Sequence, residues 1–260
     1  MTRHLLFLSL LMLSVAPSFA QTTGNIPLPA GFSRLSAEAG SFAAFLRKVP
    51  LKADKTVYLY NGQRKANQQA QFAVLDVSVG NKDLQQCADA VMRLYAEYHY
   101  AAGEYRKIAF EATDGTLLDY ASWRDGYRYK LRGSRLQKVK SATPSTSRAS
   151  FGAFLDVVFS YAGTLSLSRE LARVSNQQDI RPGDVVLQGG SPGHAVIVMD
   201  VAVNGAGEKR FLLAQSYMPA QSIHILNNPS AASPWYQAAW GASLATPEWT
   251  FGRDCLYRWR

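Results

Sequence analysis

Residues 181–198 read RPGDVVLQGGSPGHAVIV. The segment Asp184 to Gln188 is predicted to be a strand, the glycines after it predict a turn, and His194 opens a second strand. This pattern fixes one imidazole at a strand end, beside a glycine-rich turn that a substrate backbone can approach closely. A histidine there serves chemistry chiefly where a nucleophile meets it, and the chain offers two thiols, Cys87 and Cys255.

The N-terminus predicts export. Residues 1–20 contain Arg3, an apolar run from Leu5 to Val15 and a final Ala20, a pattern typical of a secretory signal peptide. Cleavage after Ala20 leaves residues 21–260, and these 260 − 20 = 240 residues suit a single domain. No other stretch reaches the roughly 20 apolar residues that span a bilayer. We therefore expect a periplasmic or secreted protein without a transmembrane anchor.

The chain is basic, with a formal net charge of +9, and removal of Arg3 with the signal peptide leaves +8. An excess of positive charge favours an anionic partner. Outside the cytoplasm, the acidic peptides and glycans of the bacterial cell wall fit that description better than nucleic acid does. We expect peptidoglycan, or another anionic wall peptide or glycan, as the partner.

A helix is predicted to carry Cys87. Asp83 can cap its N-terminus, with Gln86 three residues on, as in a capping box. The apolar stripe of this helix comprises Leu84, Cys87, Val91, Leu94 and Tyr98. Cys87 is therefore expected in the first turn and on the buried face.

The segment from about residue 103 to 150 is predicted to be a helical and basic insertion that contains short aromatic strands or loops. Between Gly126 and Leu155 it has no acidic residue. Between the same two residues lie seven positive charges: Arg128, Lys130, Arg132, Arg135, Lys138, Lys140 and Arg148. Such a run is either a solvated face or an anion-binding rim. A second amphipathic helix is predicted from Phe151 to Ala162.

The fold class is predicted to be α+β, with the Cys87 helix packed on an antiparallel sheet that bears His194. Further strands are expected at residues 56–60, 72–77, 194–203, 210–217, 222–226 and 250–258. Residues 204–207 form a hairpin turn. If Val203 pairs with Glu208, paired residue numbers add up to 411, and Gln215 falls opposite Val196 on the face of His194.

Three residues form the candidate catalytic site: Cys87, His194 and Gln215. The first turn of a helix stabilises a thiolate, and its free N–H groups, or the amides of Gln85 and Gln86, are suited to hold an oxyanion. Each residue also has a structural interpretation. Cys87 fits an inert core thiol, His194 a cap on the glycine-rich turn, and Gln215 a buried amide with its partners satisfied. Asp200 shares the parity of His194 but lies roughly 20 Å along the strand.

No metal and no cofactor is expected. His99, His194 and His224 are scattered, without HExxH or CxxC spacing, and the chain has no phosphate-binding loop. A C-terminal aromatic cluster, Trp235, Tyr236, Trp240 and Trp249, either packs the tail or lines a glycan groove.

The cysteine helix, the Pro182-Gly183-Asp184 strand, the Gly193-His194 strand and the third polar residue, Gln215, together resemble the papain-like hydrolases of the NlpC/P60 and CHAP type. Those enzymes cleave peptide or amide bonds in peptidoglycan. The resemblance implies a papain-like core in which Cys87 attacks a carbonyl, His194 relays its proton and Gln215 orients His194.

Most of residues 21–260 also resembles domain-of-unknown-function family 4846, an uncharacterised family of exported bacterial proteins. The segments that carry this resemblance are residues 86–94, 161–168, 189–196 and 213–221. The family implies no activity.

Two functions remain open from the sequence. The first is an exported cysteine hydrolase, an amidase or peptidase of cell-wall bonds, although an acyltransferase would use the same thiol and imidazole. The second is a non-catalytic periplasmic binding module for anionic wall components. A disulfide between Cys87 and Cys255 would staple that module, as two cysteines in an exported protein suggest.

Overall fold

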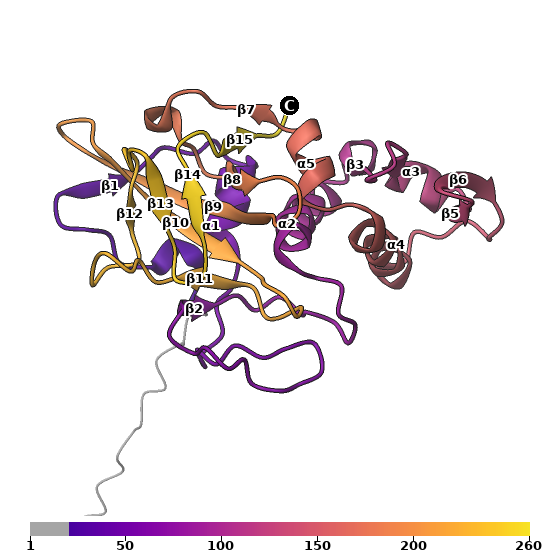
Figure 1. The fold of residues 1–260 in the computed structure, drawn as a ribbon, viewed down its shortest axis with the longest axis horizontal. Helices are drawn as coiled ribbons and strands as arrows, with labels where there is room; N and C mark the ends of the chain where they lie inside the picture. The colour runs from indigo at the N-terminus through magenta and orange to yellow at the C-terminus, as the bar shows by residue number, and fades with distance from the viewer. Residues whose placement is uncertain (1–20) are drawn as a thin grey trace, which may run out of the picture.

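The computed structural model describes residues 21–260 (Figure 1). The predicted signal peptide, residues 1–20, lies outside the described residues. A mixed α+β fold is present, in which an antiparallel sheet carries helices on one face and a group of shorter elements extends to one side.

The central sheet has nine strands, and every pairing within it is antiparallel. Its path runs β2-β11-β10-β9-β8-β15-β7, with β1 paired to β9 and β12 paired to β10. The strands are β1 (Phe32–Arg34), β2 (Gln71–Val74), β7 (Ala172–Arg173), β8 (Val185–Gln188), β9 (His194–Asn204), β10 (Lys209–Gln215), β11 (His224–Leu226), β12 (Tyr236–Gln237) and β15 (Leu256–Arg258). The strand expected at residues 56–60 is reduced to isolated bridges at Tyr58 and Leu59.

Alternation along β9 divides the core into two layers. Ala195, Ile197 and Met199 belong to the cluster beneath α1 (Phe42–Lys48) and α2 (Cys87–Ala101). Val196 and Val198 belong to the opposite cluster, which the C-terminal segment covers with β12, β13 (Ser243–Ala245) and β14 (Thr250–Gly252). His194 has the parity of Val196, so its side chain belongs to the second layer.

The register of the β9–β10 hairpin changes partway along. Near the turn, Leu212 pairs with Asp200, and paired residue numbers add up to 412. From Leu213, which pairs with Val198, they add up to 411. The predicted register is therefore wrong near the turn and right at the inner end of the hairpin.

This β-bulge decides where the third candidate residue points. A one-residue shift in register moves every side chain of a strand to the opposite face. Had the register near the turn continued, Gln215 would face Ile197 and the helices. With the bulge it shares the layer of His194.

The helix α2 begins at Cys87, later than predicted. The backbone N–H of Gln86 donates to the Asp89 carboxylate at 2.9 Å, which closes the first turn from within. The predicted N-cap, Asp83, instead accepts a hydrogen bond from the backbone of Ala220 at 2.6 Å. The N-cap prediction is wrong, but the position of Cys87 in the first turn and on the buried face is confirmed.

The second predicted amphipathic helix is α4 (Arg148–Tyr161), which is followed by α5 (Thr164–Glu170). Its buried residues are Phe151, Phe154, Leu155, Val158 and Phe159, whereas Ala162, where the predicted helix ends, is its half-buried C-cap. Within residues 21–260 no single helix has both the length and the apolar character to cross a membrane. Only α4 and α5 taken together have them, and this pair is bent by 99°. Short 3-10 helices lie at η1 (Thr23–Asn25), η2 (Tyr105–Lys107) and η3 (Gln177–Asp179).

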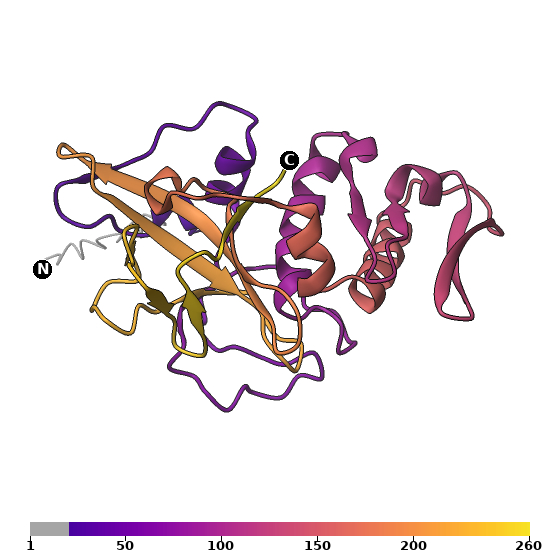
Figure 2. The same cartoon turned by 45° about the horizontal axis from the view of Figure 1, so that its top comes forward.

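Residues 103–147, here called the arm, form the predicted insertion. It contains β3 (Ala109–Glu111), β4 (Leu117–Asp119), α3 (Tyr120–Arg124), β5 (Tyr127–Arg132) and β6 (Arg135–Lys140). The arm extends away from the sheet, beyond α2, in both views (Figures 1 and 2). Its predicted helical character holds for α3 and η2 only, and the predicted short strands form two β-hairpins, whose turns contain Gly115 and Gly133 at positive φ.

Candidate functional site

Cys87 lies where α2 meets the open end of the sheet. It is 6% exposed. The backbone amides of Ala195, the residue after His194, and of Ala88 lie close enough to its sulfur to lower the pKa of the thiol. The segment before the cysteine is fixed to the end of β10, because the Ser216 hydroxyl donates to the carbonyl of Gln85 at 2.8 Å. The N-terminus of α2 therefore lies beside the backbone at the start of β9, one residue from His194.

The environment of Cys87 does not favour the thiolate. Burial raises the pKa of the thiol above its ordinary value, and the nearby Asp89 carboxylate raises it further. The backbone amides of Ala88, Ala195 and Cys87 itself lower it, by less. The expectation that the first turn of the helix acidifies this thiol is corrected, because desolvation outweighs the amide groups.

His194 is fully buried at the start of β9. Its ring packs against Tyr217, Trp249 and Phe251, at centroid distances of 5.0, 5.2 and 5.7 Å. Its Nε2 lies 2.9 Å from Oε1 of Gln215. Its Nδ1 is buried without a hydrogen-bond partner, so no hydrogen bond joins His194 to Cys87 in this structure.

The orientation of the Gln215 amide follows from its other partner. Its Nε2 donates to Oε2 of Glu248 at 2.8 Å, and a carboxylate oxygen can only accept. The amide oxygen must therefore face His194 and accept from Nε2–H. This contact assigns the ring proton to Nε2 and leaves a lone pair on Nδ1.

Lys65, Glu248 and His224 complete a network around Gln215. Lys65 Nζ lies 2.5 Å from Oε2 of Glu248. His224 donates through Nδ1 to the Ser222 carbonyl at 2.8 Å, so its Nε2 faces the Gln215 amide as an acceptor at 3.4 Å. The interpretation of Gln215 as a satisfied buried amide and its contact with His194 therefore both hold.

Sequence reasoning missed Lys65 and Glu248 and treated His224 only as a scattered ligand candidate. Lys65 and Glu248 lie outside every helix and strand, so no periodic pattern marks them. His224 pairs with Gln215 across β10 and β11, a pairing that the order of strands in the sheet decides.

Burial controls the protonation of both imidazoles. Desolvation lowers the pKa of His194 to about 4, although its hydrogen bond to Gln215 and the charge of Glu248 act to raise it. Desolvation likewise lowers the pKa of His224 to about 3. At neutral pH the site holds a neutral imidazole and a neutral thiol.

Cys87 and Cys255 are both free and buried. The carbonyl of Cys255 accepts from the amide of Leu187 on the outer side of β8, and Leu187 in turn pairs with Ala195 of β9. Neighbouring strands lie about 4.8 Å apart. The two cysteines therefore lie about two strand spacings apart. This distance exceeds the roughly 7 Å between Cα atoms that a disulfide spans. The disulfide of the binding-module alternative does not form in this arrangement.

Asp184, just before β8, and Asp200 of β9 have structural partners. Asp200 is fully buried and binds Arg34 and Arg47 at 2.7 Å each, away from His194 as expected. Asp184 of the Pro-Gly-Asp strand binds Arg258 at 2.7 Å. These carboxylates fix the sheet and the C-terminus.

The metal-ligand candidates and the C-terminal aromatic residues do not come together at one place. Among residues 21–260, no group of three or more His, Cys, Asp or Glu side chains is placed to hold a metal ion. Trp235 and Tyr236 are buried, and with Trp240 they line a cavity of about 630 Å³. The packing interpretation holds for the first two. Trp249 instead packs on His194.

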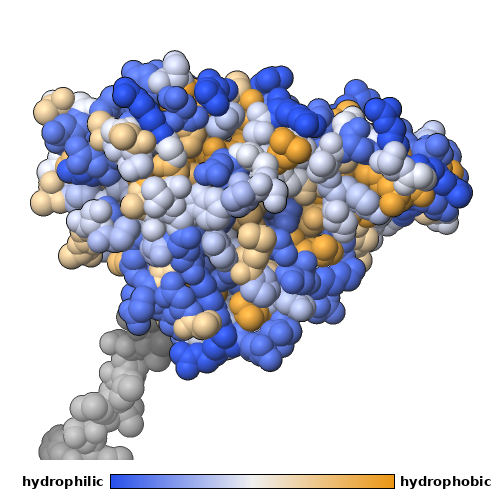
Figure 3. Space-filling model, viewed as in Figure 1, coloured by the Kyte–Doolittle hydropathy of each residue, from blue (hydrophilic) through white to orange (hydrophobic). Residues whose placement is uncertain are grey.

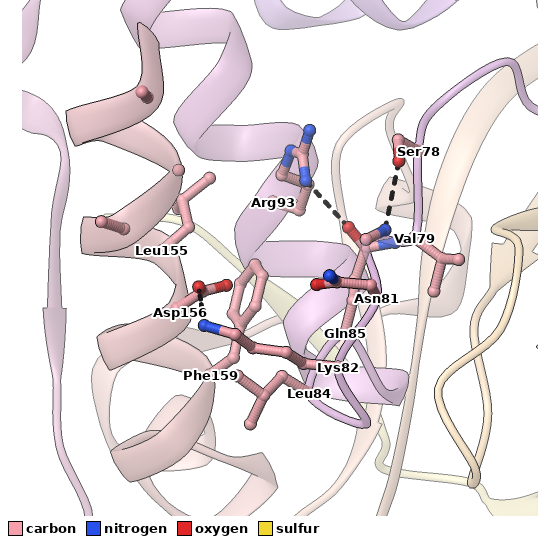
Figure 4. Close-up of a pocket in the computed structure, with 14 residues that line it drawn as sticks. Ser78, Val79, Asn81, Lys82, Leu84, Gln85, Arg93, Leu155, Asp156 and Phe159 are labelled. Carbon is pink, nitrogen blue, oxygen red and sulfur yellow. Dashed lines mark hydrogen bonds and ion pairs between the residues drawn. The ribbon is translucent and has the colours of Figure 1, made fainter. Parts of the chain in front are cut away.

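A second cavity, of about 370 Å³, lies beside the segment that leads into α2 (Figure 4). Lys82 and Asp156 form an ion pair of 2.7 Å between this segment and α4. Gln85 is buried here; its Oε1 accepts from Arg93 at 3.0 Å and its Nε2 has no partner. The cavity offers polar groups within a few residues of the thiol.

Of the two side-chain amides considered as oxyanion donors, that of Gln86 is engaged, because it donates to Asp83 at 3.1 Å. That of Gln85 is unpaired but faces the cavity of Figure 4. The backbone N–H groups that act on the thiol of Cys87 are its own, that of Ala88 at the start of α2 and that of Ala195 in β9.

The family model described as Domain of unknown function (4846) matches residues 23–258. No curated protein matches the chain. No solved structure matches it either.

Proposed function

This chain belongs to the DUF4846 family, whose description names no activity, and we propose that it is an exported cysteine hydrolase of papain-like architecture. Its substrates are peptide or amide bonds of peptidoglycan, and its place is the periplasm or the cell exterior. The proposal is supported by the predicted signal peptide, the basic charge, and the order of a cysteine helix before a histidine strand in an antiparallel sheet.

One observation carries the proposal. The chain of contacts from Glu248 through Gln215 fixes the proton of His194 on Nε2, so that Nδ1 is an unpaired base. A structural cap on a turn would use both ring nitrogens or expose one, because a buried nitrogen without a partner costs roughly 1–3 kcal/mol. We assign this base to the thiol of Cys87, because the backbone of Ala195, the next residue after His194, lies close to that thiol.

The reaction follows from these positions. Sγ of Cys87 attacks the carbonyl carbon while Nδ1 of His194 takes the thiol proton, and the backbone N–H of Cys87 stabilises the oxyanion. The C–N bond then breaks, and Nδ1 returns the proton to the leaving amine. Water, deprotonated by the same nitrogen, hydrolyses the thioester and releases the carboxylate and the thiol.

The protonation states set the course of the first step. Because burial raises the pKa of Cys87 and lowers that of His194, the two residues are uncharged at rest. Proton transfer must therefore accompany the attack, as in general base catalysis. Gln215 and the charge of Glu248 stabilise the imidazolium that forms.

The two buried cysteines provide a matched test. Purified chain and the variants Cys87→Ala and Cys255→Ala are incubated with soluble peptidoglycan fragments, and new amino termini are detected by mass spectrometry. We expect Cys87→Ala to lose at least 1,000-fold in turnover, as on removal of other nucleophiles, and Cys255→Ala to retain it. Equal turnover by both variants, or none by the parent protein, would contradict the hydrolase.

A further inference from the structure

The cavity shown in Figure 4 lies between the segment of residues 78–85 and the helix α4. Its volume of about 370 Å³ falls within the range of roughly 300–1,000 Å³ that is usual for sites of small ligands. Its apolar lining includes Leu84, Leu155 and Phe159. Figure 3 shows apolar patches among hydrophilic ones at the position that α4 has in Figure 1.

One turn of α4 presents small residues to this cavity: Ala149, Gly152 and Ala153. Glycine is among the least favourable residues inside a helix. Neither backbone conformation nor crowding requires it at position 152, because its φ is not positive and an added Cβ would meet no atom of another segment within 4 Å. The missing side chain therefore keeps this side of the cavity open.

Arg93 of α2 is held on two sides where it lines the cavity. Its Nε donates to Oε1 of Glu97 at 2.7 Å, and its Nη1 donates to Oε1 of Gln85 at 3.0 Å. Within residues 21–260 its other terminal nitrogen, Nη2, makes no hydrogen bond, and it is not among the buried polar atoms that lack a partner. A guanidinium fixed in this way offers its free edge to a carboxylate with little further loss of side-chain freedom.

The amide of Gln85 provides a second donor. Gln85 is 1% exposed, and because Arg93 can only donate, the amide oxygen must face Arg93. Its Nε2 is therefore left without an acceptor in the wall of the cavity. A buried donor without a partner destabilises the empty site, and an oxygen atom of a ligand would remove that cost.

The charge of the cavity fits one anionic group. Lys82 and Asp156 pair at 2.7 Å and neutralise each other. Glu97 is shared by Arg93 and Arg148. Three cations therefore meet two acidic groups, and one positive charge remains at the side of Arg93.

We propose that this cavity binds the free carboxylate of a short peptide that ends in a small residue. The carboxylate binds Arg93 and Gln85, and the small side chain lies against Gly152. A sugar acid carries the same charge, but the apolar lining at Leu155 and Phe159 would leave its hydroxyl groups without partners.

The cavity adjoins the proposed nucleophile. Gln85 precedes Cys87 by two residues, and two residues of chain span at most about 7 Å between Cα atoms. We therefore expect the scissile bond of a substrate bound here to lie close to its C-terminus. This use of the cavity rests on the proposed function, whereas the binding of the carboxylate does not.

Isothermal titration calorimetry tests the binding. The probe is N-acetyl-dialanine, as the free acid and as the C-terminal amide, and the protein is Cys87→Ala, so that neither probe is hydrolysed. A hydrogen bond to a charged group is stronger than one between neutral groups. We expect the acid to bind at least roughly 10-fold more tightly than the amide.

Two substitutions that each remove one partner of Glu97 separate the role of Arg93 from that of charge. Arg93→Gln should weaken binding of the acid by at least roughly 10-fold. Arg148→Gln removes the same charge and also leaves Glu97 with one arginine, but Arg148 does not line this cavity. This control should stay within a few-fold of the parent.

A second pair of variants tests the cavity itself. Gly152→Leu should fill it and weaken binding by at least roughly 10-fold, whereas Gly152→Ala adds one methyl group and should bind within a few-fold of the parent. Both residues favour a helix more than glycine does, so α4 should remain intact in each variant.

Four results would overturn the proposal. Equal affinity for the acid and the amide would exclude recognition of the carboxylate. Equal losses in Arg93→Gln and Arg148→Gln would mean that net charge alone attracts the probe. Full affinity in Gly152→Leu would place the peptide elsewhere. Binding of glucuronate without binding of the peptide would assign the cavity to acidic sugars.

The same measurements distinguish this site from the proposed hydrolase. Binding of the free acid by a chain that does not hydrolyse peptidoglycan fragments would contradict the hydrolase alone. Hydrolysis by the parent protein without any binding of the peptide acid would overturn the carboxylate site alone.

Discussion

Nε2 of Gln215 donates a hydrogen bond of 2.8 Å to Oε2 of Glu248. This contact determines how the amide is turned, and hence which nitrogen of His194 carries the proton. An amide that is free to flip would hold the imidazole in neither tautomer. Glu248 is therefore a positioning residue of the proposed site, although it lies 33 positions from Gln215 in the sequence.

Replacement of Gln215 by Leu should reduce turnover more than it reduces substrate binding. The variant loses the acceptor that orients His194, and we expect kcat to fall by roughly 10- to 100-fold with KM nearly unchanged. Steady-state kinetics on peptidoglycan fragments measures the effect. Gln71→Leu is the control, because Gln71 is also a buried amide but binds the Lys55 carbonyl instead. Unchanged kcat in Gln215→Leu would show that another group orients the imidazole.

The ion pair between Lys65 and Glu248 should show strong coupling in stability. Both side chains are largely buried, and breaking a buried pair from one side costs about 3 kcal/mol or more. We expect Lys65→Met and Glu248→Gln each to lower the free energy of unfolding by about that amount. The double variant should lose at least about 1 kcal/mol less than the two losses together.

Urea denaturation measures this coupling. The exposed pair Lys82 and Asp156 is the control, since such a pair contributes about 1 kcal/mol or less. Simple additivity at Lys65 and Glu248 would show that the two charges act independently.

The thiol of Cys87 should alkylate slowly at neutral pH. Its pKa lies above the ordinary value of 9.0, because burial disfavours the thiolate. In a Cys255→Ser background, the iodoacetamide reaction rate should therefore keep rising beyond pH 9.0. A rate that is already constant below that pH would indicate a preformed thiolate and imidazolium pair, and with it a different first step.

Acid should destabilise the fold through His194. Above pH 6.5 the imidazole is neutral in both the folded and the unfolded chain, so its protonation does not change the free energy of unfolding. As pH falls from 6.5 towards about 4, the unfolded chain binds a proton that the folded chain excludes, and stability falls. By pH 4.5 this amounts to roughly 2.5 kcal/mol.

Unfolding free energies of the parent and of His194→Asn, at pH 7 and pH 4.5, isolate this contribution. The variant should lose less stability on acidification by roughly that amount. Equal losses in the two proteins would mean that His194 titrates normally and that its site is hydrated.

The sequence alone determined the local elements of this protein. The apolar stripe placed Cys87 in the first turn of a buried helix, and the glycine-rich turn before an apolar run placed His194 at the start of a buried strand. Such patterns are local, because a helix or strand must turn its apolar side chains to one face. They could be predicted without knowledge of the partners of each element.

Only the tertiary structure decided the contacts between elements. The register set at the turn would have placed Gln215 on the face opposite His194. The β-bulge beyond Leu212 shifts that register by one residue and places both side chains on the same face. Glu248 and Lys65, which lie outside regular elements, are brought to Gln215 by the packing of the C-terminal segment on the sheet. The pKa of Cys87 followed burial instead of helix position, since desolvation depends on every atom around the sulfur and not on the residues beside it in the chain.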